Sequence, residues 1–309
     1  MKQEKIVKKI KRACKSGNAG QLGCKNNDEC YTSKQDVYNE LSQWAALDKF
    51  RNKNIICPCD TEESAFVQVL TENKEAWGIK SINYSHYNPD TFEGTRFQYI
   101  DYSKYDVCIT NPPFSLKAEF MSCIVDKIDF IVLLPFVSRN KNPIGIPLML
   151  NKAYLGYGVE CHLCFKNPTK ENNYSGTKIV NCDWITSFPE AQAERNARHF
   201  KSGVKYDLYK DEFEVVDKMV MKDDTCPIRV SMSTYPEDYD GWMFANIGVL
   251  DNLDQETYEW YSTDTTGFFN HDPVGKTLSP FKGHWTCDKI AIGNRKLFGG
   301  IVFRKKQGG

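Results

Sequence analysis

Short apolar runs alternate with helix-like segments between residues 54 and 136, and this rhythm is the strongest constraint on the fold. "NIIC" (54–57) and "VCIT" (107–110) are short β-forming runs, and "DFIVLLPF" (129–136) is an unbroken apolar run typical of a strand inside a parallel sheet. Helical spacing of apolar residues recurs at 34–49 and 115–128. Strands that alternate with helices indicate βαβ units, so we predict an α/β fold with a doubly wound, mostly parallel sheet.

Further strands are expected at 80–87, 179–188, 241–250 and 297–305, with a strand edge within 96–106. A helix should follow the first strand, with Asp60 or Thr61 as its cap and Glu62 and Glu63 in its first turn. The rhythm loosens after Pro135, and charged and turn residues dominate from about 190. We therefore expect a basic N-terminal arm at 1–27, an α/β domain at 28–190 and a smaller accessory region at 191–309.

Charge and cysteine content narrow the class of protein. Lys+Arg and Asp+Glu are each 40, so a uniformly basic nucleic-acid binder is not expected, although local basic patches are compatible with this balance. No apolar window reaches the length of a membrane span, and the N-terminus lacks the apolar core of a signal peptide. The twelve cysteines are irregularly spaced, which favours reduced thiols in a cytoplasmic protein. "CHLC" (161–164) has metal-like spacing, but its second ligand pair is missing, so no metal is expected.

Two of the predicted strands end in unusual chemistry, at "CPCDTEES" (57–64) and "TNPPFS" (110–115). In an open parallel sheet, ligands bind outside the carboxyl ends of the strands, and both segments should lie on that edge. Their shared position predicts one site built from both segments.

The tetrapeptide Asn111-Pro112-Pro113-Phe114 is suited to hold an amino group on an aromatic ring. The prolines fix the backbone, so the side-chain carbonyl of Asn111 and the main-chain carbonyl of Pro112 are two rigid acceptors. Two convergent acceptors match an –NH2 group, and Phe114 offers a face on which a ring can stack. An amine held in this way loses conjugation with its ring and becomes nucleophilic. The simpler alternative is a proline-rich turn after a strand.

In this context "ITNPPF" resembles the catalytic motif of methyltransferases that use S-adenosylmethionine to modify adenine in DNA. "DECYTSKQDVYNEL", "IICPCDTEESAF", "YDVCITNPPFSL" and "NCDWITSF" occur in the order seen in the EcoRI-type adenine-specific DNA methyltransferase family. The similarity runs from about Asp28 to Phe188. It implies a Rossmann-like methyltransferase fold, with target recognition in the C-terminal region.

The resemblance also implies roles for individual residues. Asn111, Pro112, Pro113 and Phe114 would bind and activate a flipped adenine. The residues that correspond to the cofactor site are Tyr31, Thr32, Pro58, Asp60, Ser64, Phe66 and Asp101. The chain departs from the usual methyltransferase pattern because "CDTEES" stands where a glycine-rich loop is common, and because the second strand ends without the acidic residue that commonly holds the ribose.

The expected partner is double-stranded DNA, with a cognate restriction endonuclease as an optional second partner and no membrane. Phosphate contacts are expected from the basic arm and from the loop "SRNKN" (138–142), through Lys8, Lys9, Lys11, Arg12, Lys15 and Arg139. For the arm the alternative is a solvated tail, and for the loop an exposed polar loop without a ligand. The aromatic and amide residues Trp242, Asn246, Trp260 and Asn294 either read bases or, more simply, belong to the core.

Three functions remain open on the sequence alone. The preferred one is a site-specific adenine methyltransferase on duplex DNA, bacterial or phage-encoded, acting as part of a restriction-modification system or alone. The second is an amino-methyltransferase that acts on RNA bases or on a protein glutamine. The third is a non-catalytic DNA-binding protein with a methyltransferase fold. The oligomeric state is left open, with a monomer preferred.

Overall fold

A computed structural model describes residues 32–88, 91, 93–158, 162–166, 177–197, 204–231 and 235–307. The N-terminal half forms α2 (Lys34–Ala46), β1 (Asn54–Cys57), α3 (Ala65–Glu72), β2 (Ser81–Tyr84), β3 (Val107–Thr110), α4 (Lys117–Ile124), β4 (Asp129–Pro135), α5 (Gly145–Met149), β5 (Tyr154–Leu155), β6 (His162–Lys166) and β7 (Thr177–Thr186). The ends of β1 and β3 are as predicted. The strand edge expected at 96–106 is wrong, because the 3-10 turns Phe97–Tyr99 and Tyr102–Lys104 occupy that segment.

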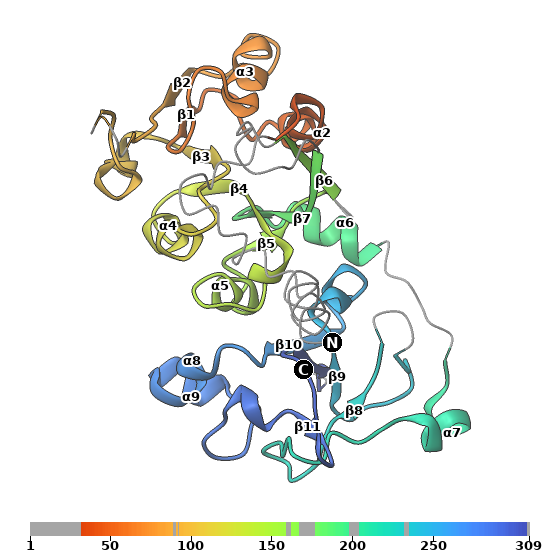
Figure 1. The fold of residues 1–309 in the computed structure, drawn as a ribbon. Coiled ribbons are helices and arrows are strands. Elements are labelled where there is room, and N and C mark those ends of the chain that lie inside the picture. The colour runs from red at the N-terminus through yellow and green to blue at the C-terminus, as the bar shows by residue number, and fades with distance from the viewer. Residues whose placement is uncertain are drawn as a thin grey trace, which may run out of the picture. The chain divides into compact units, whose positions relative to one another are not determined.

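The large sheet has the strand order β2-β1-β3-β4-β7-β5, with β6 paired to β7. β1 pairs in parallel with both β2 and β3, whereas β5 and β6 run antiparallel to β7. The chain therefore moves outward from β1 to β2 and then returns to the other side of β1 for β3. Because βαβ crossovers are right-handed, this reversal of direction places α3 and α4 on opposite sides of the strands, as Figure 1 shows. The predicted α/β doubly wound sheet is confirmed.

The helix after β1 begins later than predicted. Ser64 is its cap and accepts a hydrogen bond from the backbone N–H of Val67 at 3.2 Å. Asp60 and Thr61 therefore do not cap it, and Glu62 and Glu63 lie in the turn that precedes it. The longer loop places Asp60 at the edge of the sheet instead of on the helix.

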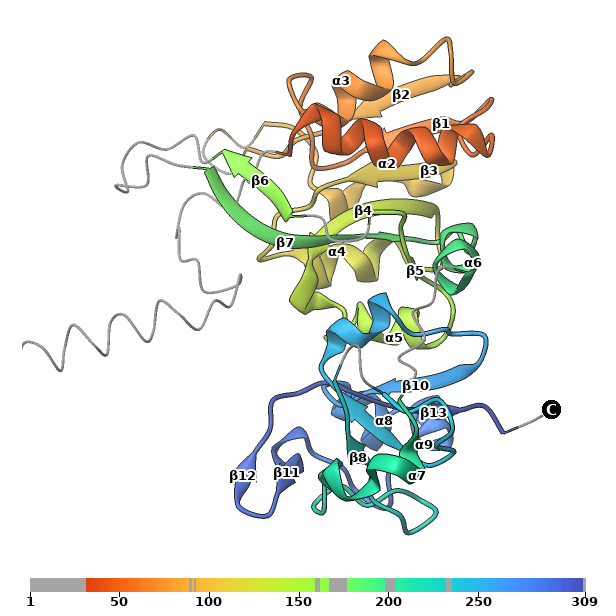
Figure 2. The ribbon, with the colours of Figure 1, turned by 90° about the vertical axis from the view of Figure 1, so that its right-hand side faces the viewer.

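The rest of the chain forms short elements: α6 (Glu190–Ala197), α7 (Tyr206–Tyr209), β8 (Ile228–Arg229), β9 (Met243–Ala245), β10 (Tyr258–Ser262), α8 (Thr266–His271), α9 (Pro273–Leu278), β11 (Ala291–Ile292), β12 (Arg295–Lys296) and β13 (Ile301–Lys305). β10-β13-β9-β8 make a four-stranded sheet, and β11 and β12 make a separate hairpin, which Figure 2 shows beside β8. The strands expected at 241–250 and 297–305 are thus shorter than predicted, at β9 and β13.

By internal packing the chain divides into two units. The first comprises Met1–Phe120, Val132–Val137 and Glu160–Asp183, and the second Met121–Ile131, Ser138–Val159 and Trp184–Gly309. The predicted boundary near 190 stays a prediction, since the second unit also takes in two segments from the first half of the chain. None of the helices in the described part of the chain has both the length and the apolar character that a membrane crossing requires.

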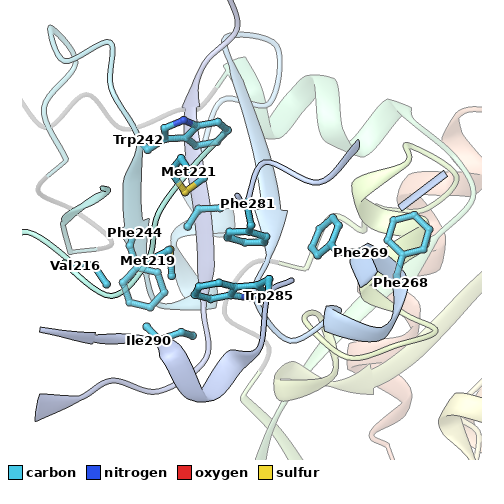
Figure 3. Packing of buried hydrophobic residues seen from close by; sticks show 11 residues of the cluster. Val216, Met219, Met221, Trp242, Phe244, Phe268, Phe269, Phe281, Trp285 and Ile290 are labelled. Carbon is cyan, nitrogen blue, oxygen red and sulfur yellow. The ribbon is translucent and has the colours of Figure 1, made fainter. Parts of the chain in front are cut away.

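The second unit has its own aromatic core (Figure 3), to which Trp242, Phe244, Phe269, Phe281 and Trp285 contribute. The rings of Phe281 and Trp285 stack at 4.4 Å between centroids. Trp242 and Trp260 are 3% and 7% exposed, which confirms their assignment to the core and leaves neither available to read bases.

Candidate active site

The candidate site lies where the sheet changes direction, at the carboxyl ends of β1 and β3. Ile55 and Ile56 pair in parallel with Val107 and Cys108, so the two strands leave the sheet at the same edge. Such a switch point is where open α/β sheets bind ligands. The structure therefore brings together the two segments whose chemistry was unusual in the sequence.

Asp60 connects the two segments directly. Its side chain is 6% exposed, and the hydroxyl of Thr110, the last residue of β3, donates a hydrogen bond to the carboxylate at 2.5 Å. Its backbone N–H donates to the carbonyl of Ser85, just beyond β2, at 3.2 Å. The loop after β1 is thus held by both neighbouring strands, without the glycines that methyltransferases commonly use there.

The electrostatic state of Asp60 is unusual for an aspartate. Burial raises its pKa to about 7, and the hydroxyls of Thr110 and Ser64 oppose this rise in part by hydrogen bonding to the carboxylate. None of the described lysines and arginines lies within ion-pair distance of it. Burial also raises the pKa of the Cys57 and Cys108 thiols well above the usual range, so both remain neutral beside it. The site thus holds a buried carboxyl group without a cationic partner among the described residues.

The Asn-Pro-Pro-Phe segment follows Thr110 without a break. Asn111 and Pro113 are half-buried and Pro112 is buried. The carbonyl of Pro113 accepts from the N–H of Leu116 at 2.9 Å, so the segment is followed by a turn into α4. Phe114 is only 5% exposed, so a base can stack on its ring only if the neighbouring side chains give way.

The other predicted cofactor residues of the first unit differ in burial and in hydrogen bonding. Pro58 and Phe66 are buried and Ser64 caps α3, which gives all three a structural role. Thr32 stands before the cap of α2, and its hydroxyl oxygen is buried without a hydrogen-bond partner among the described residues. Tyr31 lies outside the described residues.

These observations fit S-adenosylmethionine as a ligand. The molecule carries a positively charged sulfonium and an ammonium group, either of which would supply the cation that Asp60 lacks. A buried hydroxyl without a partner, such as that of Thr32, is a group that a polar ligand would satisfy.

Asp101 has a local role in the structure. It is exposed, its carboxylate accepts from the hydroxyl of Ser103 at 2.6 Å, and Lys104 lies 3.5 Å away. These contacts lower the pKa of Asp101, chiefly through Ser103. Its assignment to the cofactor stays a prediction.

The predicted DNA contacts are placed very differently. Lys8, Lys9, Lys11, Arg12 and Lys15 lie outside the described residues. The prediction of an exposed polar loop at 138–142 is wrong in part, because Ser138, Arg139 and Asn140 are buried. Arg139 is 2% exposed and forms an ion pair with Asp251 at 2.8 Å, so its guanidinium has an internal partner within the second unit. A phosphate contact by Arg139 stays a prediction.

No group of three or more metal-ligating side chains occurs within the described ranges. Cys161 of the "CHLC" sequence lies outside those ranges, so the structure does not describe that motif as a whole.

The residue that sequence reasoning missed is Thr110. A hydroxyl at the last position of a buried apolar strand, directly before Asn111, is a polar group that needs a partner, and this was the signal that could have identified it. Its partner lies 50 positions away in the sequence, at Asp60.

Comparison with known proteins identifies relatives of this chain. Residues 21–105 match the model of a family described as "Adenine-specific methyltransferase EcoRI". The matched segment includes Asp60 and ends before Asn111. The resemblance to EcoRI-type methyltransferases that the motifs indicated is thereby confirmed.

Two curated proteins are also similar. The Type II methyltransferase M.MgeORF184P of Mycoplasma genitalium is 26% identical over 197 residues, which cover 52% of this chain and 62% of the relative. The Type II methyltransferase M.EcoRI of Escherichia coli is 22% identical over 292 residues, 75% of this chain and 85% of the relative. The alignment thus spans less than two thirds of the Mycoplasma protein.

Among solved structures, one from Pyrococcus horikoshii, described as a candidate RNA methyltransferase, aligns with a TM-score of 0.36 and 10% identity. The alignment covers 52% of this chain and 87% of that protein.

Proposed function

We propose that this chain, a relative of the EcoRI-type adenine-specific methyltransferases, is a site-specific DNA methyltransferase. It transfers a methyl group from S-adenosylmethionine to the exocyclic N6 amine of an adenine that is flipped out of double-stranded DNA. The observation that carries the proposal is the hydrogen bond between Asp60 and Thr110, which joins the candidate cofactor loop to the strand that delivers Asn111. This bond supports a common position for cofactor and amine at one edge of the sheet.

Asn111 and Pro112 act on the amine. Their carbonyl oxygens accept hydrogen bonds from the two N–H groups of the amine and orient the nitrogen lone pair out of the plane of the ring. The two acceptors are held in fixed positions because Pro112 and Pro113 restrict the backbone, so catalysis depends mainly on positioning of the amine. Since the target amine cannot be reached inside a duplex, the base must first leave the stack.

Asp60 acts on the cofactor side. The bound cofactor supplies an electrophilic methyl group on a cationic sulfur. The buried carboxylate of Asp60 stabilises the positive charge of this ligand, and Thr110 and Ser64 hold the carboxylate in place. The hydroxyl of Thr32 provides a further polar contact.

The test is methylation-aware sequencing of DNA from cells that express the wild-type chain or Asn111→Ala. Wild type should leave N6-methyladenine in one recurring sequence motif, and Asn111→Ala should leave none while it still folds and binds S-adenosylmethionine. Asn39→Ala, on the exposed face of α2, is the matched control and should methylate as wild type does.

Each alternative function has its own result in the same experiment. Unmodified DNA together with methyl-labelled RNA would assign the activity to RNA bases. DNA binding without methylation of either nucleic acid would assign a non-catalytic role. Near wild-type methylation by Asn111→Ala would refute the assignment of the Asn-Pro-Pro-Phe segment.

In this proposal the protein acts in the cytoplasm and modifies the DNA of its own cell. A cognate endonuclease in the same organism would make the methylation protective, and its absence would leave a solitary methyltransferase.

A further inference from the structure

Phe298 is the most exposed large apolar side chain of the described residues, at 92%. Leu297, directly before Phe298, is half-buried and packs against the aromatic core of the second unit. Lys296, which precedes Leu297, is exposed. A single exposed phenylalanine is common on protein surfaces, so the significance of Phe298 depends on how the chain presents it and on the charge around it.

The segment that carries Phe298 is held rigidly before this residue. In the β11–β12 hairpin, the N–H of Gly293 donates to Asp217 at 2.9 Å, and Arg295 forms an ion pair with Glu214 at 2.6 Å. The N–H of Leu297 donates to the carbonyl of Ile290 at 2.9 Å, which extends the hairpin pairing to the residue before Phe298.

The chain is equally fixed after Phe298. A Cβ atom added to Gly299 would lie 2.2 Å from the carboxylate of Asp264, and one added to Gly300 would lie 2.2 Å from the carbonyl of Ala245. Thr263 exchanges two hydrogen bonds of 2.9 Å with the backbone of Gly300. Phe298 is therefore displayed from a backbone anchored on both sides, which lowers the entropy cost of using it in binding.

The charge of this segment indicates the kind of partner. Residues 288–306 carry six basic side chains and one acidic side chain, Asp288, in a chain whose net charge is zero. Three of the six form ion pairs, through Arg295, Arg304 and Lys305. Lys289, Lys296 and Lys306 form no ion pair with the described residues, although the pKa of Asp288 is lowered first by its hydrogen bond with Thr286 and then by Lys296 and Lys289. The segment therefore keeps a net positive charge that suits an anionic partner.

We propose that Phe298 and Lys296 form a duplex-DNA contact of the second unit, in which Lys296 binds a backbone phosphate and Phe298 inserts against the bases. A cationic segment with a rigid apolar wedge matches the way in which proteins unstack a base step. The proposal rests on the proposed function, because double-stranded DNA is the substrate that a methyltransferase of this kind has to bind.

The experiment measures binding of a fluorescein-labelled DNA duplex by fluorescence anisotropy, first with a mixed sequence and then with any motif found to be methylated. Phe298→Ala should weaken binding about tenfold, because a base stacked on an aromatic side chain contributes ~1–3 kcal/mol. Phe298→Trp should restore binding. Lys296→Ala should lower the slope of log affinity against log salt by about 0.9, the value for one phosphate.

Leu208→Ala is the matched control, since Leu208 is also apolar and 75% exposed but lies on α7. It should bind duplex as wild type does, and thermal unfolding should be unchanged in all variants. Binding by Phe298→Ala within twofold of wild type, or a change in self-association without a change in DNA binding, would overturn the proposal. If wild type binds duplex but leaves no methyladenine, the proposed function fails while the comparison of Phe298 variants still decides this inference; a wild type that binds no duplex overturns both.

Discussion

The buried carboxyl of Asp60 makes the stability of this protein depend on pH in a direction opposite to that of a salt-bridged aspartate. Its pKa of about 7, against an ordinary value of 3.8, means that the folded state keeps the proton over a range in which the unfolded chain releases it. Between these two values the folded state binds more protons than the unfolded state, so the free energy of unfolding falls as pH rises. The full difference corresponds to about 4 kcal/mol, of which about 3 kcal/mol is lost between pH 5 and pH 8.

Asp60→Asn removes the ionisable group but keeps its size and its ability to bond to Thr110. We expect urea unfolding to show that the free energy of unfolding of Asp60→Asn, measured relative to wild type, increases by about 3 kcal/mol between pH 5 and pH 8. The neighbouring Cys57 and Cys108 thiols do not contribute, since their pKa values are raised well above this range. Asp207→Asn, on exposed α7, controls for the loss of a negative charge elsewhere. Parallel pH profiles for wild type and Asp60→Asn would refute the claim that a buried, unpaired carboxyl occupies this position.

The same group should link pH to cofactor binding. A cationic ligand binds the ionised form of Asp60, so the affinity of the wild type for S-adenosylmethionine should rise as pH increases from 5 to 8, with release of a proton. Isothermal titration calorimetry in buffers of different ionisation enthalpy measures that proton directly. Asp60→Asn should show weaker binding and no proton release from this site, and an unchanged proton release would place the cofactor elsewhere.

Three further outcomes follow from the structure. Phe281→Ala should cost about 3–5 kcal/mol in urea unfolding, because it removes a stacked ring from the core of the second unit. Arg139→Ala should cost about 1–3 kcal/mol, because Asp251 loses its nearest cation but keeps Arg195 at 3.6 Å. Lys141→Ala, which breaks an ion pair whose lysine is 57% exposed, should cost at most about 1 kcal/mol. Deletion of residues 1–15 should weaken duplex binding and flatten its salt dependence by about 0.9 for each phosphate that the arm neutralises; an unchanged slope would identify the arm as a solvated tail.

The fold of the first unit was predictable because its signals are local. The apolar runs that became β1, β3 and β4 have clear ends, and right-handed crossovers then leave few arrangements for a sheet built from them. The start of α3 was not predictable in the same way. Aspartate is common at helix N-caps, but the carboxylate of Asp60 accepts a hydrogen bond from Thr110, and Ser64 caps the helix instead. A contact across 50 residues thus overrode the local preference.

Arg139 shows the same limit more strongly. Its neighbours in the sequence are polar, and this context is typical of an exposed loop. Its ion-pair partner Asp251 is 112 residues further along the chain, so the burial of this arginine follows from packing in the second unit and from no local feature.

The strands and the exposed aromatic residues of the second unit could not be predicted from local sequence, because they depend on contacts between distant residues. Its strands are two to five residues long, and β13, near the C-terminus, pairs with both β9 and β10. Large aromatic residues were the natural candidates for base contacts, yet Trp242 is covered on one face by Arg304 at 4.2 Å, and its indole N–H donates to Asp223 at 3.0 Å. Phe298 looked like the start of a strand but stands outside it, because the two glycines that follow must pass against Asp264 and Ala245 before β13 can begin. The close packing at Gly299 and Gly300 thus leaves Phe298 exposed while Trp242 is buried, and the type of residue alone predicts neither outcome.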